Sequence, residues 1–136
     1  NRYVDERISI IHTALGERNE FLQLRNYMEE NSVVTDDGEQ QISCTSLNEL
    51  LQGKVPTLIK IDVEGYEEQV LTGSMEVITR CRPVLAVAIY HKEEDFWKIP
   101  LLIKEKYPFY SLFIRSYMNI HETILYAVPE NRLVGG

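Results

Sequence analysis

The ten residues "LIKIDVEGYE", Leu58–Glu67, decide the fold class of this chain. They begin as an apolar strand, pass two carboxylates at Asp62 and Glu64, and run through a glycine into a helical pattern. A strand with so few polar residues is typical of a parallel strand that is covered on both faces. A second apolar strand, "PVLAVAIYH" (Pro83–His91), follows after one helical segment. From Val55 onward the predicted order is strand, helix, strand, helix, strand, strand, which indicates an α/β fold with a mainly parallel sheet.

The closing strands and the helices complete this core. "YSLFIRSYM" and "ETILYAVP", joined by "NIH", predict an antiparallel pair. Ser46 with Glu49 has the spacing of a capping box and predicts a short helix that ends at Gly53. Gly73 is expected to break the next helical segment in two. That segment has one apolar side, formed by Val70, Leu71, Met75 and Ile78.

The N-terminal third predicts further strands. "RISIIHTALGE" (Arg7–Glu17) indicates a buried strand that leaves into a turn, and "NEFLQLRNY" (Asn19–Tyr27) a half-exposed strand. Asp37 and Gly38 predict the turn of a hairpin. Asp36 and Asp37 also suggest calcium, but the other ligands of a calcium loop are missing from the spacing, so a plain turn is favoured.

Bulk composition limits the possible functions. With 136 residues the chain fits one domain, in which residues 1–45 hold the N-terminal strands and 46–136 the strand-helix core. A net charge of −7 argues against binding to nucleic acid, which needs clustered basic residues. Its apolar runs are too short to span a bilayer. Cys44 and Cys81 fit neither a zinc spacing nor a redox pair, so reduced thiols in the cytoplasm are expected.

Polar residues follow both central strands. Asp62 and Glu64 end the first, and Tyr90 and His91 end the second. Ligands of parallel sheets bind outside the carboxyl ends of the strands, and a right-handed crossover makes these two strands neighbours. We therefore expect Asp62 and His91 at one edge of the sheet, with Gly65 allowing a tight turn or the close approach of a ligand.

Structural explanations compete with this functional one. Asp62 or Glu64 would cap the following helix and interact with its positive end. Lys60 lies on the same strand face as Asp62, two residues away, and would pair with it. Most histidines at strand ends take no part in chemistry, so His91 alone is a weak signal.

Several ordered segments of the chain resemble the FkbM family of methyltransferases. Where the family reads "KIDVEGAE" and then "VLKGA", this chain has "KIDVEGYE" and "VLTGS". Asn48 stands where aspartate is usual, and Tyr66 replaces a small residue beside the expected site. The segments that carry the resemblance are "RISIIHTALGE", "CTSLNELL", "LIKIDVEGYEEQVLTGS", "RPVLAVAIYHKEEDFWKIPLLIK" and the two closing strands.

The resemblance implies a Rossmann-like sheet of the class I methyltransferases, with S-adenosylmethionine as cofactor. The family binds this cofactor with a glycine-rich loop after strand one and an acidic residue that ends strand two. The segment at Arg7 matches strand three, and the seven glycines of this chain form no Gly-x-Gly. The first two strands are therefore expected to be missing, which leaves a gap in the family's strand order 3-2-1-4-5-7-6. The N-terminal strands would then dock elsewhere, or two chains would pair through their sheet edges.

By resemblance, the complete enzyme would transfer a methyl group to a hydroxyl oxygen of a sugar or natural-product acceptor. Asp62 would act as the base or orient the acceptor, with His91 as the alternative base. A divalent metal held by Asp62 and Glu64 is conceivable, but two carboxylates alone define no metal site. The cofactor's adenine would contact Ala14, Leu15 and Gly16. Supporting roles near the acceptor would fall to Lys60, Glu64, Gly65, Tyr66 and Tyr90.

Two other functions compete. Without the glycine-rich loop the chain would be inactive alone, or would be a non-catalytic interaction module. A phosphate or nucleotide at the helix start after Gly65 is disfavoured, since acidic side chains crowd that end. These are Asp62, Glu64, Glu67 and Glu68.

Overall fold

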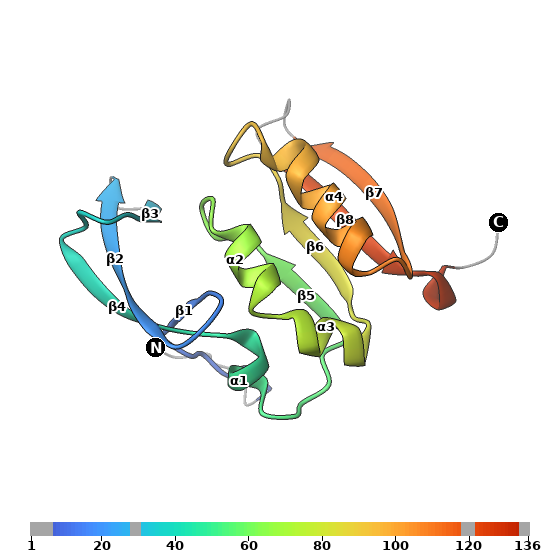
Figure 1. Cartoon of the computed structure of the whole chain (residues 1–136), viewed down its shortest axis with the longest axis horizontal. Coiled ribbons are helices and arrows are strands. Elements are labelled where there is room, and N and C mark those ends of the chain that lie inside the picture. The colour runs from blue at the N-terminus through green and yellow to red at the C-terminus, as the bar shows by residue number, and fades with distance from the viewer. Residues whose placement is uncertain (1–6, 28–30, 118–121, 134–136) are drawn as a thin grey trace.

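The computed structural model describes residues 7–27, 31–117 and 122–133 and shows a mixed α/β fold with two four-stranded sheets (Figure 1). The first sheet has the order β1-β4-β2-β3 and the second the order β5-β6-β8-β7. The strands of the first are β1 (Ala14–Leu15), β2 (Glu20–Tyr27), β3 (Asn31–Val34) and β4 (Gln40–Thr45). Those of the second are β5 (Leu58–Ile61), β6 (Val84–Ala88), β7 (Tyr110–Tyr117) and β8 (Glu122–Pro129). The helices are α1 (Leu47–Leu51), α2 (Glu67–Thr72), α3 (Met75–Cys81) and α4 (Asp95–Lys106), with a 3₁₀ turn at Glu130–Arg132.

The second sheet follows the predicted element order. β5 and β6 are parallel neighbours, and β8 lies antiparallel between β6 and β7. The "NIH" connection of this closing pair lies outside the described residues. The prediction of a mainly parallel sheet is wrong, since only β5–β6 and β1–β4 are parallel among the described pairs. In the predicted sheet, β7 and β8 follow one another through a short connection and pair antiparallel, and β8 then lies antiparallel beside β6.

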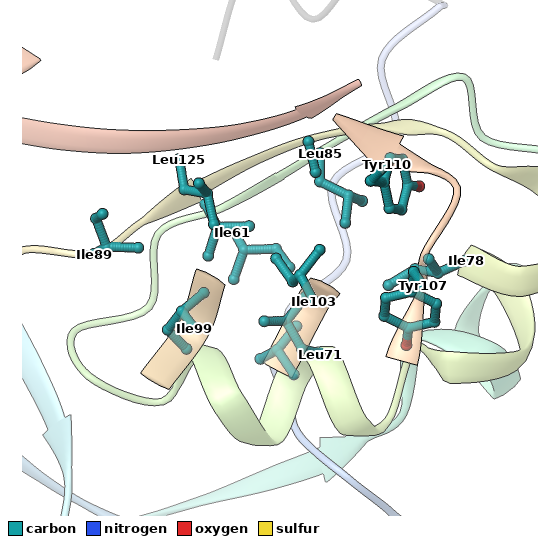
Figure 2. Close-up of a cluster of buried hydrophobic side chains, with 13 residues drawn as sticks. Ile61, Leu71, Ile78, Leu85, Ile89, Ile99, Ile103, Tyr107, Tyr110 and Leu125 are labelled. Atoms are coloured by element: carbon teal, nitrogen blue, oxygen red, sulfur yellow. The ribbon is translucent and has the colours of Figure 1, made fainter. Parts of the chain in front are cut away.

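The core lies between the second sheet and helices α2, α3 and α4 (Figure 2). Leu71 of α2 and Ile99 and Ile103 of α4 pack with Ile61 and Leu85 of the strands, all at most 2% exposed. Burial of each such side chain contributes about 1.5–3 kcal/mol. These contacts fix α2 and α4 against β5 and β6, and with them the loops that follow both strands.

The first strand of the second sheet, β5, is not covered on both faces, contrary to the prediction. Leu58 of β5 is 61% exposed and Lys60 is also exposed, although Ile61 is buried. On β8, buried residues alternate with half-buried ones, so the helices cover one face of this sheet. Of the described strands only β6 pairs with β5, which is therefore an edge strand.

The start of the described chain also departs from the prediction. The buried strand expected at Arg7–Glu17 is limited to two residues of β1, which pair with Cys44 and Thr45 of β4. The apolar side chains that precede β1 are exposed. They are Ile8, Ile10 and Ile11, at 57%, 79% and 57% exposure.

The expected hairpin at Asp37 and Gly38 is wrong as well. Val34 of β3 and Gln40 of β4 both pair with Leu24, on opposite edges of β2. The connection between them therefore crosses over β2. A Cβ atom on Gly38 would lie 2.6 Å from backbone atoms of Leu24, so only glycine fits at this crossing.

The predicted helix signals are mostly confirmed. Ser46 caps α1, because its Oγ accepts a hydrogen bond from the Glu49 N–H at 3.3 Å. The helix ends at Gln52, whose φ of 44° is left-handed, and Gly53 follows. Gly73 separates α2 from α3 as expected. Met75, placed on the buried side by its spacing, is 40% exposed, and Val77 is buried instead.

Cys44 and Cys81 are free thiols, as their spacing predicted. None of the described helices has the length and apolar character that crossing a membrane requires.

Candidate functional site

Asp62 and His91 meet at the carboxyl ends of β5 and β6. The parallel register pairs Ile61 with Val87, so the residues that follow each strand emerge at the same edge. Nε2 of His91 lies 3.6 Å from Oδ1 of Asp62. The predicted juxtaposition of these two side chains is confirmed, while their chemical roles stay predictions.

Glu64 returns to the same point through a strained turn. Its φ is 52° and that of Gly65 is 90°, two left-handed residues in succession. A non-glycine residue held in this region costs of order 1–3 kcal/mol and is frequent at functional sites. The turn places Oε2 of Glu64 3.5 Å from Nε2 of His91. The N-cap residue of α2 is Tyr66 rather than Glu64, and the Tyr66 side chain makes no capping hydrogen bond.

Glu67 is the central residue that the sequence reading did not single out. It begins α2, yet its side chain is only 1% exposed. Oε1 accepts a hydrogen bond from the Val63 N–H at 3.1 Å and lies 2.8 Å from Nδ1 of His91. Burial alone would raise the pKa of Glu67, but the hydrogen bonds from His91 and Val63 bring it below its ordinary value. A buried, ionised carboxylate therefore contacts Nδ1 of His91 and holds the ring in place.

The orientation of His91 follows from this partner. An ionised carboxylate can only accept hydrogen bonds, so Nδ1 carries the proton and donates to Glu67. Burial lowers the pKa of His91, but the contact with Glu67 and the nearby Glu64 and Asp62 outweigh it, and the net shift is upward. The imidazole is 8% exposed, and Nε2 has no hydrogen-bond partner within the described part of the chain.

Tyr90 and Lys60 hold the outer side of Asp62. The Tyr90 hydroxyl donates to Oδ1 of Asp62 at 3.3 Å. The centroids of the Tyr90 and His91 rings lie 4.2 Å apart. Burial and the charge of Asp62 raise the pKa of Tyr90 to about 12. Nζ of Lys60 lies 3.1 Å from Oδ2 of Asp62, so the predicted structural pairing is present. Asp62 remains 31% exposed, which leaves it accessible to a ligand.

Two pockets border this cluster. A polar cleft of about 770 Å³ lies between the first sheet and the start of α2, and Glu64, Gly65 and Tyr66 line it. Asp62 and Tyr90 line a smaller pocket of about 290 Å³ with Lys60, Tyr117, Glu122 and Ile124. Tyr66 therefore lies beside a cleft, as expected for the residue that departs from the family pattern. Facing residues of the large cleft are Glu17, Arg18, Glu20, Phe21, Gln69 and Lys92.

Lys92 is a second residue that the sequence reading missed. Its Nζ donates to the carbonyl oxygen of Gly65, which ties the loop after β6 to the turn after β5. A Cβ atom on Gly65 would lie 2.9 Å from Cε of Lys92. The expected need for glycine at this turn therefore has two causes, the positive φ and the lysine.

The segment predicted to contact adenine borders Tyr66, since a Cβ atom on Gly16 would lie 3.2 Å from Cε1 of Tyr66. Ala14, Leu15 and Gly16 line neither of the two pockets described above. Leu15 instead lines an apolar pocket of about 250 Å³ beside β5, together with Leu47 and Leu58. Gly16 packs against Gly73, where an added Cβ atom would lie 1.9 Å from the Gly16 carbonyl oxygen.

Comparisons with known proteins agree with this architecture. The crystal structure of methyltransferase FkbM from Methylobacillus flagellatus KT superposes with a TM-score of 0.71 at 24% identity, which shows a shared fold. The match covers 89% of this chain but 28% of that protein, so the chain spans less than a third of its neighbour. No curated protein matches the sequence. The family profile described as the methyltransferase FkbM domain matches residues 5–125. The chain therefore belongs to the FkbM methyltransferase domain family.

Proposed function

We propose that this chain forms the acceptor side of a methyltransferase that uses S-adenosylmethionine. The acceptor would be a hydroxyl group of a sugar or natural product. The observation that carries the proposal is the cluster of Asp62, Glu64 and His91 at the carboxyl ends of β5 and β6, in a chain of the FkbM family. Ligands of such sheets bind at this edge.

The reaction needs positioning and a proton acceptor. The acceptor oxygen would attack the methyl carbon of the sulfonium, forming a C–O bond while the C–S bond breaks. The products would be a methyl ether and S-adenosylhomocysteine, and the hydroxyl proton would pass to a base. Asp62 is accessible beside a pocket and would accept this proton or orient the hydroxyl group. His91 is the alternative, because Nδ1 donates to Glu67 and leaves Nε2 facing the site.

Tyr90 and Glu67 would act through these two residues. The Tyr90 hydroxyl bonded to Asp62 fixes the carboxylate, and Glu67 fixes the tautomer and rotation of His91. Fixed orientation of the acceptor group and base accounts for much of the rate in such displacements.

Variants of a complete parent enzyme test the assignment. We expect Asp62→Asn to reduce turnover by 10²-fold or more, the size of a typical acid–base contribution, while cofactor affinity stays nearly unchanged. Glu68→Gln is the matched control, since Glu68 is exposed on the same helix start and loses the same charge. Equal turnover of the Asp62→Asn enzyme and the control would exclude Asp62 from the chemistry.

We also propose that this stretch is inactive by itself. The family's cofactor cradle is a glycine-rich loop, and the seven glycines here form no Gly-x-Gly. Calorimetric titration with S-adenosylhomocysteine tests this directly. An absence of heat would support a scaffold and acceptor role for the stretch. Saturable binding would show that other residues bind the cofactor and would overturn this part of the proposal.

The alternative of an interaction module is favoured by one observation, the edge strand β5. Among the described strands it pairs only with β6, and Leu58 is exposed on it. Such an edge is a template for pairing with another chain, including a second copy. Sedimentation velocity that shows a dimer at micromolar concentration would support this function, and a compact monomer would exclude the homodimer.

A further inference from the structure

We propose that Asp62, Glu64 and His91 bind a divalent transition-metal cation, of the class of Mn²⁺ or Zn²⁺, at the carboxyl ends of β5 and β6. The three donor atoms would be Oδ1 of Asp62, Oε2 of Glu64 and Nε2 of His91. The inference goes beyond methyl transfer, and its test involves neither cofactor nor acceptor.

The spacing of the donor atoms fits an ion better than direct hydrogen bonds. Nε2 lies 3.6 Å from Oδ1 of Asp62 and 3.5 Å from Oε2 of Glu64. Both distances exceed the 2.7–3.2 Å range of N–H···O hydrogen bonds. An ion bound at about 2.1 Å to nitrogen and oxygen in tetrahedral geometry separates its donors by roughly 3.4 Å. Nε2 therefore lies from one oxygen of each carboxylate at a distance that a shared cation would span.

The state of His91 is the second and independent observation. Its side chain is 8% exposed, that is, more than nine-tenths buried, yet Nε2 has no hydrogen-bond partner within the described residues. Buried polar nitrogens are nearly always satisfied, because an orphaned one costs about 1–3 kcal/mol. This nitrogen points at two carboxylates. Facing two negative groups, Nε2 needs a positive charge at this point, which either its own proton or a cation bound between the groups would supply.

The support behind His91 is the arrangement that metal-binding histidines require. Such a histidine donates its other ring N–H to a carboxylate or carbonyl, which fixes the tautomer and the ring orientation. Here Nδ1 lies 2.8 Å from Oε1 of Glu67, which is buried and held in turn by the Val63 N–H. Nε2 is therefore presented as an acceptor toward the proposed ion.

The local charge favours a dication. Three carboxylates, those of Asp62, Glu64 and Glu67, surround one imidazole. Lys60 supplies one positive charge, but it contacts Oδ2 of Asp62, whereas His91 lies nearest to Oδ1. The Lys60 side chain is 64% exposed, and Oδ1 accepts a hydrogen bond from the Tyr90 hydroxyl at 3.3 Å.

The donor set indicates the class of cation. Carboxylate oxygens suit Mg²⁺, Ca²⁺ and Mn²⁺, whereas imidazole nitrogen suits Zn²⁺ and other transition metals. One nitrogen with two oxygens therefore favours Mn²⁺ or Zn²⁺ over Mg²⁺. Three protein ligands leave positions open for water or a substrate oxygen. An ion at this point would occupy Nε2, so proton acceptance in a metal-loaded enzyme would fall to a carboxylate.

Titration with Mn²⁺, followed by the loss of the free-ion electron paramagnetic resonance signal, tests the proposal on the chain alone. Mn²⁺ avoids binding to the two thiols, which Zn²⁺ would favour. We expect one saturable site, at least tenfold weaker in Asp62→Asn and in His91→Gln. Glu67→Gln keeps all three ligands and should weaken binding by about 10–100-fold. Glu68→Gln, which removes an exposed charge outside the site, should bind as the original chain does.

Far-UV circular dichroism of each variant establishes that it is folded, and Asp62→Asn keeps the shape of a half-exposed side chain. Absence of saturable Mn²⁺ binding would overturn the proposal. So would unchanged affinity in Asp62→Asn and His91→Gln, or an equal loss in the Glu68→Gln control, which would indicate a diffuse charge effect. Each of these results leaves the methyl-transfer assignment to its own turnover assay.

Discussion

The Glu67 carboxylate and the His91 imidazole form the buried contact that joins the start of α2 to the loop after β6. Oε1 of Glu67 lies 2.8 Å from Nδ1 of His91 and also accepts the Val63 N–H. One side chain thus ties together both loops that carry the candidate site.

Removal of this carboxylate should be strongly destabilising. Glu67→Ala leaves the Val63 N–H and the His91 N–H buried without an acceptor and opens a cavity in place of a side chain that is 1% exposed. We expect the free energy of unfolding, measured in urea, to fall by about 3–5 kcal/mol. Glu68→Ala, on the exposed side of the same helix turn, should change it by at most about 0.5 kcal/mol. Similar losses in both variants would show that Glu67 is not a structural centre.

Gly73 offers a test of close backbone packing. Its φ of −70° is open to any residue, but an added Cβ atom would lie 1.9 Å from the Gly16 carbonyl oxygen. We expect Gly73→Ala to lower the free energy of unfolding by about 3 kcal/mol or more, because backbone must move to relieve the clash.

Gly53→Ala is the control for Gly73→Ala. Gly53 has a φ of +87° with nothing near its missing Cβ atom, so its substitution tests backbone strain alone, at about 1–2 kcal/mol. If Gly73→Ala is no more destabilising than Gly53→Ala, the contact between β1 and the α2–α3 junction is not tight.

Much of the second sheet could be predicted from the sequence. Two apolar strands with a helical segment between them permit few topologies, and the right-handed crossover makes the strands parallel neighbours. The meeting of Asp62 and His91 follows from that topology alone. Ser46 before α1 and Gly73 between α2 and α3 are local signals that depend only on neighbouring residues, so the sequence predicted them as well.

The features that the sequence did not predict depend on contacts between residues that lie far apart in the chain. Glu67 looks like an ordinary exposed acid at a helix start, and only the fold shows that His91 and Val63 bury it. Asp37 and Gly38 have hairpin chemistry, but the flanking strands pair with opposite edges of β2. Leu58 belongs to an apolar strand, yet it is exposed because helices cover one face of the sheet.

Asn48 links α1 to α3 and stands where the family resemblance expects aspartate. Its Oδ1 accepts the Val77 N–H at 3.0 Å, so it caps α3 from another helix. We expect Asn48→Ala to lower the free energy of unfolding by about 1 kcal/mol, as for the loss of a helix cap. Asn48→Asp keeps the acceptor and adds a negative charge at a helix N-terminus, which should stabilise the fold by about 0.3–1 kcal/mol. If Asn48→Asp lowers the free energy of unfolding as much as Asn48→Ala does, the hydrogen bond to the Val77 N–H is not what Asn48 contributes to stability.

Two buried tyrosines predict a loss of stability at high pH. Burial raises the pKa of Tyr107 to about 12, and burial together with Tyr107 raises that of Tyr110 further. Their unfolded value is near 10. A raised pKa means that the native state favours the neutral phenol, so the stabilisation is complete below pH 10 and is lost as the pH rises through the folded pKa values. Each phenol contributes at most about 1.4 kcal/mol per pH unit in that window.

Tyr110→Phe separates this effect from general alkaline unfolding. The hydroxyl of Tyr110 donates to the Pro83 carbonyl oxygen, so at pH 8 the variant should be less stable by about 1 kcal/mol. It lacks an ionisable group at this position, so its free energy of unfolding should fall less steeply between pH 10 and 12. Urea unfolding of both proteins across this range should therefore show their difference shrinking and then changing sign. A difference that stays constant with pH would mean that the Tyr110 phenol ionises as easily in the folded chain as in the unfolded one.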